Sequence, residues 1–181
     1  MYRSFSRCLL IFGFLLGGVP LTAQVVRTVP PLRVLPDLGQ MTRRAGLIFT
    51  GTVTSITPIH ATGSDTVESV QITFQVEQAV RGPRAGRTFT IREWTGLWTS
   101  GQRYRVGERL MLFLYPPSKV GLTSPVGGAA GRFAVNGNGQ VLLSPLQVEV
   151  LKAAPARIPM DYKHRVAIRG FTSAVRRMAE E

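Results

Sequence analysis

The feature that most constrains this fold is an unbroken apolar run near the middle of the chain. Leu110 to Tyr115 are six consecutive apolar residues, with Gly107 before them and Pro116-Pro117 after them. Successive side chains of a strand point to opposite faces, so a strand of this composition needs apolar cover on both sides. The alternative is a helix fragment, but the flanking glycine and prolines leave the run too short for a stable helix. We therefore predict that residues 107–117 hold the central strand of the core.

The N-terminal segment has the three regions of a secretory signal peptide. Arg3 and Arg7 form a positive region, Leu9 to Leu16 an apolar core, and Leu21-Thr22-Ala23 the exit to a cleavage site. The alternative is a retained membrane anchor, but the apolar core is shorter than the about 20 residues that a span needs. We expect residues 1–23 to be removed, leaving an exported protein, periplasmic or extracellular, with no transmembrane span.

The mature chain contains no cysteine. Removal of 23 of the 181 residues leaves 158, and Cys8, the only cysteine, lies in the removed part. This length is sufficient for one hydrophobic core. An exported domain without disulfides depends on core packing alone. Cysteine nucleophiles, cysteine-based zinc sites and iron–sulfur clusters are excluded as well.

The mature chain is also strongly basic, with 20 basic and 10 acidic side chains and a net charge of +10. Its only lysines are Lys119, Lys152 and Lys163. Such a preference for arginine reflects either a GC-rich coding sequence or selection for anion binding. A positive surface attracts polyanions at low salt, so anionic envelope polymers are candidate partners.

Three segments follow the signal peptide. Residues 24–38 contain three prolines and no apolar period, which predicts an extended leader. Residues 39–150 are expected to form the folded domain, with Asp37 capping a short helical turn at its start. Residues 151–181 form a basic tail, either a solvated face or a patch for anionic lipid or wall polymer. Helical spacing of Phe171, Ala174, Val175 and Met178 predicts that this tail ends in an amphipathic helix.

Short strands are expected throughout residues 39–150. Val70 to Glu77 alternate between apolar and polar side chains, and Leu47 to Ile56 are rich in β-branched residues. Gly51 indicates a bulge or a sharp bend, and a third strand should end near Trp94. Asn136-Gly-Asn-Gly139 predicts a hairpin. Further strands are predicted at 132–135 and 140–143, and a short one at 146–150.

These patterns predict a mainly β protein, a small OB-like β-barrel with a short N-terminal helical turn and a C-terminal amphipathic helix. Over residues 45–136 the chain resembles the OB-like netrin and metalloproteinase-inhibitor (TIMP-like) domains, on the following motifs: Gly51-Thr-Val-Thr-Ser55, Phe74-Gln-Val-Glu77 with Arg81-Gly82, and Tyr104-Arg-Val-Gly-Glu-Arg109 before Leu112-Phe-Leu-Tyr115. The resemblance implies the barrel. In that family an N-terminal cysteine reaches the protease zinc and disulfides brace the barrel; both are missing from this chain, so inhibition is not implied.

The sequence predicts no enzyme, catalytic residue, metal ligand or cofactor. His60 and His164 stand in polar surroundings without a partner at ligand spacing, and the carboxylates are dispersed. The glycine-rich segment 127–131 is interpreted as a flexible loop rather than a phosphate site, because it precedes a predicted strand instead of a helix.

The candidate ligand-binding residues are Trp94, Trp98, Arg103, Tyr104 and Arg105. Aromatic rings beside guanidinium groups stack on sugars or bases and pair with anions. The alternative is that the two tryptophans plug the end of the barrel. The predicted function is an exported, non-catalytic interaction domain for a protein, glycan or anionic envelope component. An OB-type nucleic-acid-binding module is the alternative, although export disfavours a nucleic-acid partner.

We predict that the native protein begins at Gln24 and is found outside the cytoplasm, because the signal-peptide pattern ends at Ala23. Intact mass spectrometry of the protein purified from its own cells measures this directly. A mass that includes residues 1–23 would contradict export and would restore the nucleic-acid alternative.

Overall fold

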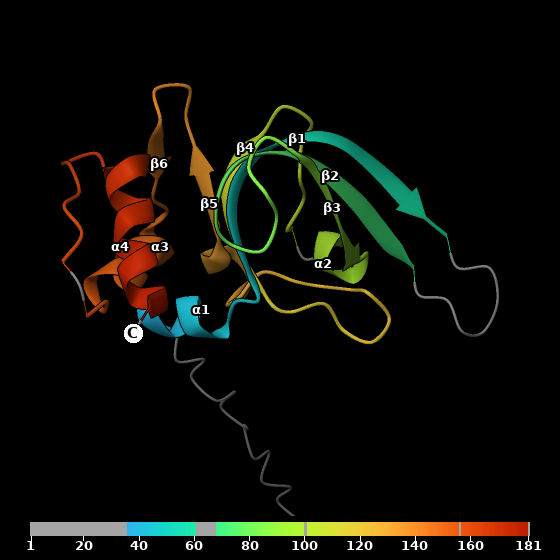
Figure 1. Cartoon of the computed structure of the whole chain (residues 1–181), viewed down its shortest axis with the longest axis horizontal. Coiled ribbons are helices and arrows are strands. Elements are labelled where there is room, and N and C mark those ends of the chain that lie inside the picture. Colours follow the sequence, from blue (N-terminus) through green and yellow to red (C-terminus); the bar gives the residue numbers. More distant parts are fainter. Residues whose placement is uncertain (1–35, 61–67, 100, 156, 181) are drawn as a thin grey trace, which may run out of the picture. The chain divides into compact units, whose positions relative to one another are not determined.

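A computed structural model describes residues 36–60, 68–99, 101–155 and 157–180 (Figure 1). The predicted signal peptide, and the leader as far as residue 35, lie outside the described residues. The described part of the chain forms one antiparallel sheet of seven strands, with four short α-helices and a 3-10 turn. Within it, no helix has the length and apolar character needed to cross a membrane.

The sheet is open and places the predicted central strand in its middle. Its order is β3-β2-β1-β4-β5-β6-β7. The strands are β1 (Leu47–Ile59), β2 (Ser69–Arg81), β3 (Thr88–Trp94), β4 (Arg109–Leu114), β5 (Arg132–Val135), β6 (Gln140–Leu142) and β7 (Arg165–Ala167). The mainly β class and the central position of β4 are thereby confirmed. Among the described residues β3 and β7 are the sheet's edges, so the strands do not close on one another.

Strand β4 is buried on both faces, as its composition requires. Leu110, Leu112 and Leu114 pack into one apolar cluster, which we call the strand core, with side chains of β1, β2 and β3. Met111 and Phe113 point the other way, into a second cluster, which we call the helix core. The helix core also takes side chains from α1, α3 and α4, which lie on the β5–β6 side of the sheet in Figure 1. One strand therefore supplies both cores.

The helices are α1 (Leu38–Arg44), α2 (Gly96–Thr99), α3 (Pro145–Lys152) and α4 (Ile168–Glu180). The predicted N-terminal turn is confirmed as α1, whose first turn is capped by a bond from the backbone N–H of Gln40 to Asp37 Oδ1 at 2.7 Å. The predicted C-terminal helix is confirmed as α4. Its buried stripe includes Phe171, Val175 and Met178, so this helix belongs to the helix core.

The strand predicted at 146–150 is wrong, because these residues lie in helix α3. Ser144 and Gln147 form a capping box, in which Ser144 Oγ accepts from the Gln147 N–H at 3.3 Å and Gln147 Oε1 accepts from the Ser144 N–H at 2.9 Å. Pro145 occupies the first turn, where its missing N–H costs nothing. These local helix-start signals override the apparent alternation of the apolar residues that follow.

The bulge predicted at Gly51 is confirmed by a register shift between Thr50 and Gly51 in the β1–β2 pairing. A Cβ atom at Gly51 would lie 2.8 Å from the carbonyl oxygen of Gln75, so only glycine allows this approach of the two strands. The hairpin predicted at Asn136–Gly139 is confirmed between β5 and β6. The glycine-rich segment 127–131 contains the 3-10 turn η1 (Gly128–Gly131), and its Ala130 lies in the helix core.

We predict that Leu112→Asp and Phe113→Asp each unfold the protein, since both side chains are fully buried on opposite faces of β4. A buried unpaired carboxylate costs several kcal/mol, which is comparable with the about 5–15 kcal/mol stability of a domain. Thermal unfolding followed by circular dichroism measures the effect. Leu142→Asp is the control, because Leu142 on β6 is 40% exposed and should tolerate the change. A wild-type transition in either core variant would show that β4 is misplaced.

Candidate functional site

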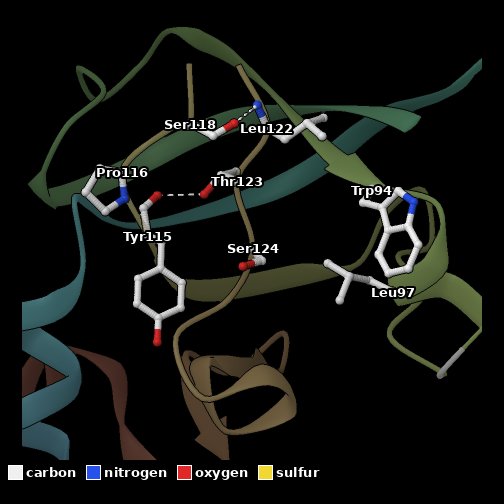
Figure 2. Close-up of a pocket in the computed structure, with 8 residues that line it drawn as sticks. All are labelled: Trp94, Leu97, Tyr115, Pro116, Ser118, Leu122, Thr123 and Ser124. Atoms are coloured by element: carbon white, nitrogen blue, oxygen red, sulfur yellow. Dashed lines mark hydrogen bonds between the residues drawn. The ribbon is translucent and has the colours of Figure 1, made fainter. Parts of the chain in front are cut away.

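An open cavity of about 340 Å³ lies between the end of β3, helix α2 and the loop that follows β4 (Figure 2). We call it the aromatic groove. Its lining residues are Trp94, Leu97, Tyr115, Pro116, Ser118, Leu122, Thr123 and Ser124. None of these eight carries a charge, and the side chains of Trp94 and Tyr115 are 53% and 37% exposed. Large aromatic side chains are therefore presented to solvent around a shallow apolar depression.

The loop on one side of the groove is held by its own hydrogen bonds. The Tyr115 N–H donates to Ser124 O at 3.0 Å, and the Thr123 hydroxyl donates to Tyr115 O at 2.6 Å. Near the tip, the Leu122 N–H donates to Ser118 Oγ at 3.1 Å (Figure 2). Two of the lining hydroxyls are thus engaged within the loop, which leaves the groove with a mainly apolar surface.

The same loop is attached to the edge strand β3. The Thr123 N–H donates to Arg92 O at 2.8 Å, and Thr123 forms an isolated parallel bridge with Glu93. These contacts cover part of an edge that would otherwise leave backbone groups unpaired. On the opposite side the indole of Trp94 lies over Gly96, where an added Cβ atom would collide with the ring. Both walls of the groove are thus held by contacts within the fold.

The five candidate binding residues occupy different environments. Trp94 lines the groove. Trp98, on α2, is half-buried against the strand core, and its Nε1 is buried without a partner among the described residues. Tyr104 is only 3% exposed and belongs to the strand core. Arg103 and Arg105 are exposed, and Arg103 Nε donates to Trp98 O at 3.3 Å. Of the five, only Trp94 is among the described lining residues.

Tyr104 is instead the centre of a buried polar contact. Its ring packs edge-to-face on Phe74, with centroids 5.8 Å apart, and the guanidinium of Arg132 lies 4.0 Å from the ring centroid. Its hydroxyl donates to Glu93 Oε1 at 2.6 Å. Burial, together with the neighbouring Glu93 carboxylate, raises the pKa of Tyr104 well above its usual value, so the hydroxyl remains a donor.

Glu93 is a fully buried carboxyl that sequence reasoning missed. It continues the inward-facing row of Phe89 and Ile91 on β3, and its Oε2 has no partner among the described residues. Burial raises the pKa of Glu93 from 4.5 to about 7, although the bond from Tyr104 and the charge of Arg132 act in the opposite direction. The alternation of β3 is the signal that could have identified it, because position 93 falls on the apolar face.

The two histidines lie on the surface. His60 Nδ1 is 3.5 Å from Glu68 Oε2, with both side chains largely exposed, so His60 does have an acidic neighbour, contrary to the sequence interpretation. His164 is exposed in a tight turn with φ 54°. Within the described ranges, no group of three or more His, Cys, Asp or Glu side chains is arranged to hold a metal ion.

Comparison with known proteins provides no relative on which to base a function. The chain matches no protein-family model, and no curated protein matches it. The groove and the buried carboxyl behind it are therefore the observations that bear on function.

We predict that the two tryptophans differ in accessibility, because Trp94 is half-exposed in the groove and Trp98 packs on the strand core. Acrylamide should quench the emission of Trp94 efficiently in Trp98→Phe, and should quench that of Trp98 weakly in Trp94→Phe. Equal and efficient quenching in both variants would mean that α2 does not pack against the strand core.

Proposed function

We propose that this protein is an exported, non-catalytic interaction domain that binds a protein or glycan partner through the aromatic groove. The observation that supports this proposal is the exposure of Trp94 and Tyr115 at an open apolar cavity. Tryptophan and tyrosine provide large contact areas at little entropic cost and dominate binding energies when a partner excludes water from them. The Trp94 ring packs against Gly96 and Tyr115 belongs to the hydrogen-bonded loop, so little ordering is expected on binding.

The charge distribution supports an uncharged ligand segment at this site. The whole chain has a formal net charge of +12, yet the eight lining residues are neutral. A surface that selects phosphate or carboxylate groups presents arginine or lysine to them. Anionic envelope polymers would therefore contact the basic surface outside the groove, and the groove would bind apolar side chains or the faces of sugar rings.

We also propose that the strongly bent part of the sheet corresponds to the OB-like barrel of netrin and TIMP-like domains. Strands β1 and β2 have 13 residues each, and their pairing is interrupted by three register shifts. Such bulges increase strand bending, and they occur at the rims of barrels. In OB-like folds the loops at one end of the barrel bind ligands.

We predict that Trp94→Ala and Tyr115→Ala each reduce partner capture by tenfold or more, while the thermal transition stays close to that of wild type. A loss of about 2 kcal/mol or more on truncation is typical of an aromatic residue central to an interface. The assay uses immobilised mature protein and an envelope fraction from the source cells. Captured proteins are identified by mass spectrometry and captured glycans by sugar analysis.

Two further variants make this assay specific. Tyr162→Ala is the matched control, because Tyr162 is 84% exposed in the turn before β7 and does not line the groove. Gly96→Ala displaces the Trp94 ring without removing it and should reduce capture as well. Equal capture by wild type and Trp94→Ala would contradict the proposal. Salt-sensitive binding of a single-stranded oligonucleotide, lost in Arg103→Ala with Arg105→Ala, would favour the nucleic-acid alternative instead.

A further inference from the structure

Glu93 and Trp94 are neighbours in the chain that face opposite sides of the edge strand β3. Trp94 faces outward into the groove, and Glu93 faces inward with no solvent exposure. Glu93 also forms the backbone bridge to Thr123, another lining residue of the groove. The backbone that presents the groove is therefore the same backbone that holds the buried carboxyl.

The surroundings of Glu93 suit a neutral carboxyl better than an ionised one. Only its Oε1 is bonded, to the Tyr104 hydroxyl, and its Oε2 has no partner among the described residues. A carboxylate has about four acceptor positions, and a buried charge that is so poorly bonded is costly. In agreement, burial is the largest influence on the pKa of Glu93, which rises to about 7.

Few charged groups face this carboxyl to offset that cost. From the loop after α2, the neighbour is Tyr104, which remains neutral. From β5 it is Arg132, whose guanidinium lies against the Tyr104 ring and also sits 3.8 Å from the Glu108 carboxylate. The neighbour of Glu93 on β2 is the apolar Val70, and its neighbour in the loop after β4 is the uncharged Thr123. The attraction of Arg132 is thus divided between two carboxylates.

We propose that the proton on Glu93 controls the aromatic groove, so that the groove is ordered and binds its partner when Glu93 is neutral and loosens when Glu93 is ionised. This proposal rests on the function proposed above, because it concerns regulation of the same groove. An ionised Glu93 must gain water or move outward. Both responses strain the attachment of the end of β3 to the loop after β4, since the Glu93 backbone bridges to Thr123 and the Thr123 N–H donates to Arg92 O. Edge strands and loops are the parts of a protein that open at least cost.

The direction of the pH effect follows from the proton balance. The pKa of Glu93 is higher in the folded protein than its ordinary value of 4.5, so the folded form binds more protons between pH 4.5 and about 7. Stability contributed by Glu93 is therefore complete below pH 4.5, decreases as the pH rises through this interval, and is lost above pH 7. The equilibrium constant for separation of the end of β3 from the loop after β4 should therefore increase by about two orders of magnitude between pH 4.5 and about 7.

The test follows the Trp94 indole N–H by NMR from pH 5 to 8.5, without any ligand. The background variant carries His60→Asn and His164→Asn so that no imidazole contributes to the response, and asparagine tolerates the positive φ of residue 164. The Trp94 signal should shift or broaden with a midpoint near pH 7. Glu93→Gln, which resembles the neutral carboxyl, should keep the low-pH signal throughout. Glu77→Gln is the control carboxylate, because Glu77 is partly exposed and pairs with Arg109, and it should leave the response unchanged.

A second variant keeps the proposal testable if Glu93→Gln fails to fold. Tyr104→Phe removes the hydrogen bond that favours ionised Glu93, so the midpoint of the Trp94 response should move to higher pH. A Trp94 signal that does not change between pH 5 and 8.5, or a response that persists in Glu93→Gln, would overturn the proposal.

Capture of the partner at pH 5.5 and at pH 8 then separates the two proposals. Capture that depends on Trp94 and is at least tenfold stronger at pH 5.5, with the difference abolished in Glu93→Gln, is the expected result. Trp94-dependent capture that is equal at both pH values would overturn the control by Glu93 while leaving the binding function intact. A Trp94 NMR signal that responds to pH, combined with capture that does not depend on Trp94, would instead refute the binding function.

Discussion

The structure depends on the complete burial of strand β4 on both of its faces. Leu112 packs into the strand core and Phe113 into the helix core, so neither cluster would be complete without this strand. The chain needs such shared packing, because it has a single cysteine and no disulfide within it limits the unfolded ensemble. The loop that leaves β4 at Tyr115 also forms one wall of the aromatic groove. The groove is thereby anchored to a strand that is buried on both faces.

Sequence reasoning succeeded where the pattern is local and strong. The apolar run around Leu112 predicted the central strand β4, and Gly51 predicted the bulge in the neighbouring strand β1. The spacing of Phe171 and Val175 predicted the last helix, α4. It failed at α3, where alternation of apolar residues was given more weight than the capping box of Ser144. It also missed β7, because a three-residue strand is specified by its partner across the sheet rather than by its own composition.

The candidate site was predictable only in part, since side-chain environment depends on long-range contacts. The segment around Trp94 was identified by its aromatic and basic composition, but nothing local shows that Tyr104 turns inward to bond Glu93, 11 positions away. The opposite wall of the groove comes from the loop after β4, which is attached to β3 through the pairing of Thr123 with Glu93. A mainly apolar groove backed by a buried carboxyl is thus a property of the tertiary structure. The basic character of the chain is expressed elsewhere on its surface.

Strand β3 turns Glu93 into the protein interior while it presents Trp94 to the groove. Carbon-13 NMR of the Glu93 carboxyl carbon, followed as a function of pH in the wild-type protein and assigned with Glu93→Gln, measures the pKa of that group directly. We expect a midpoint near 7, because burial opposes ionisation. A midpoint at the ordinary value of about 4.5 would show a solvated carboxyl. It would contradict both the register of β3 and the control of the groove by a proton.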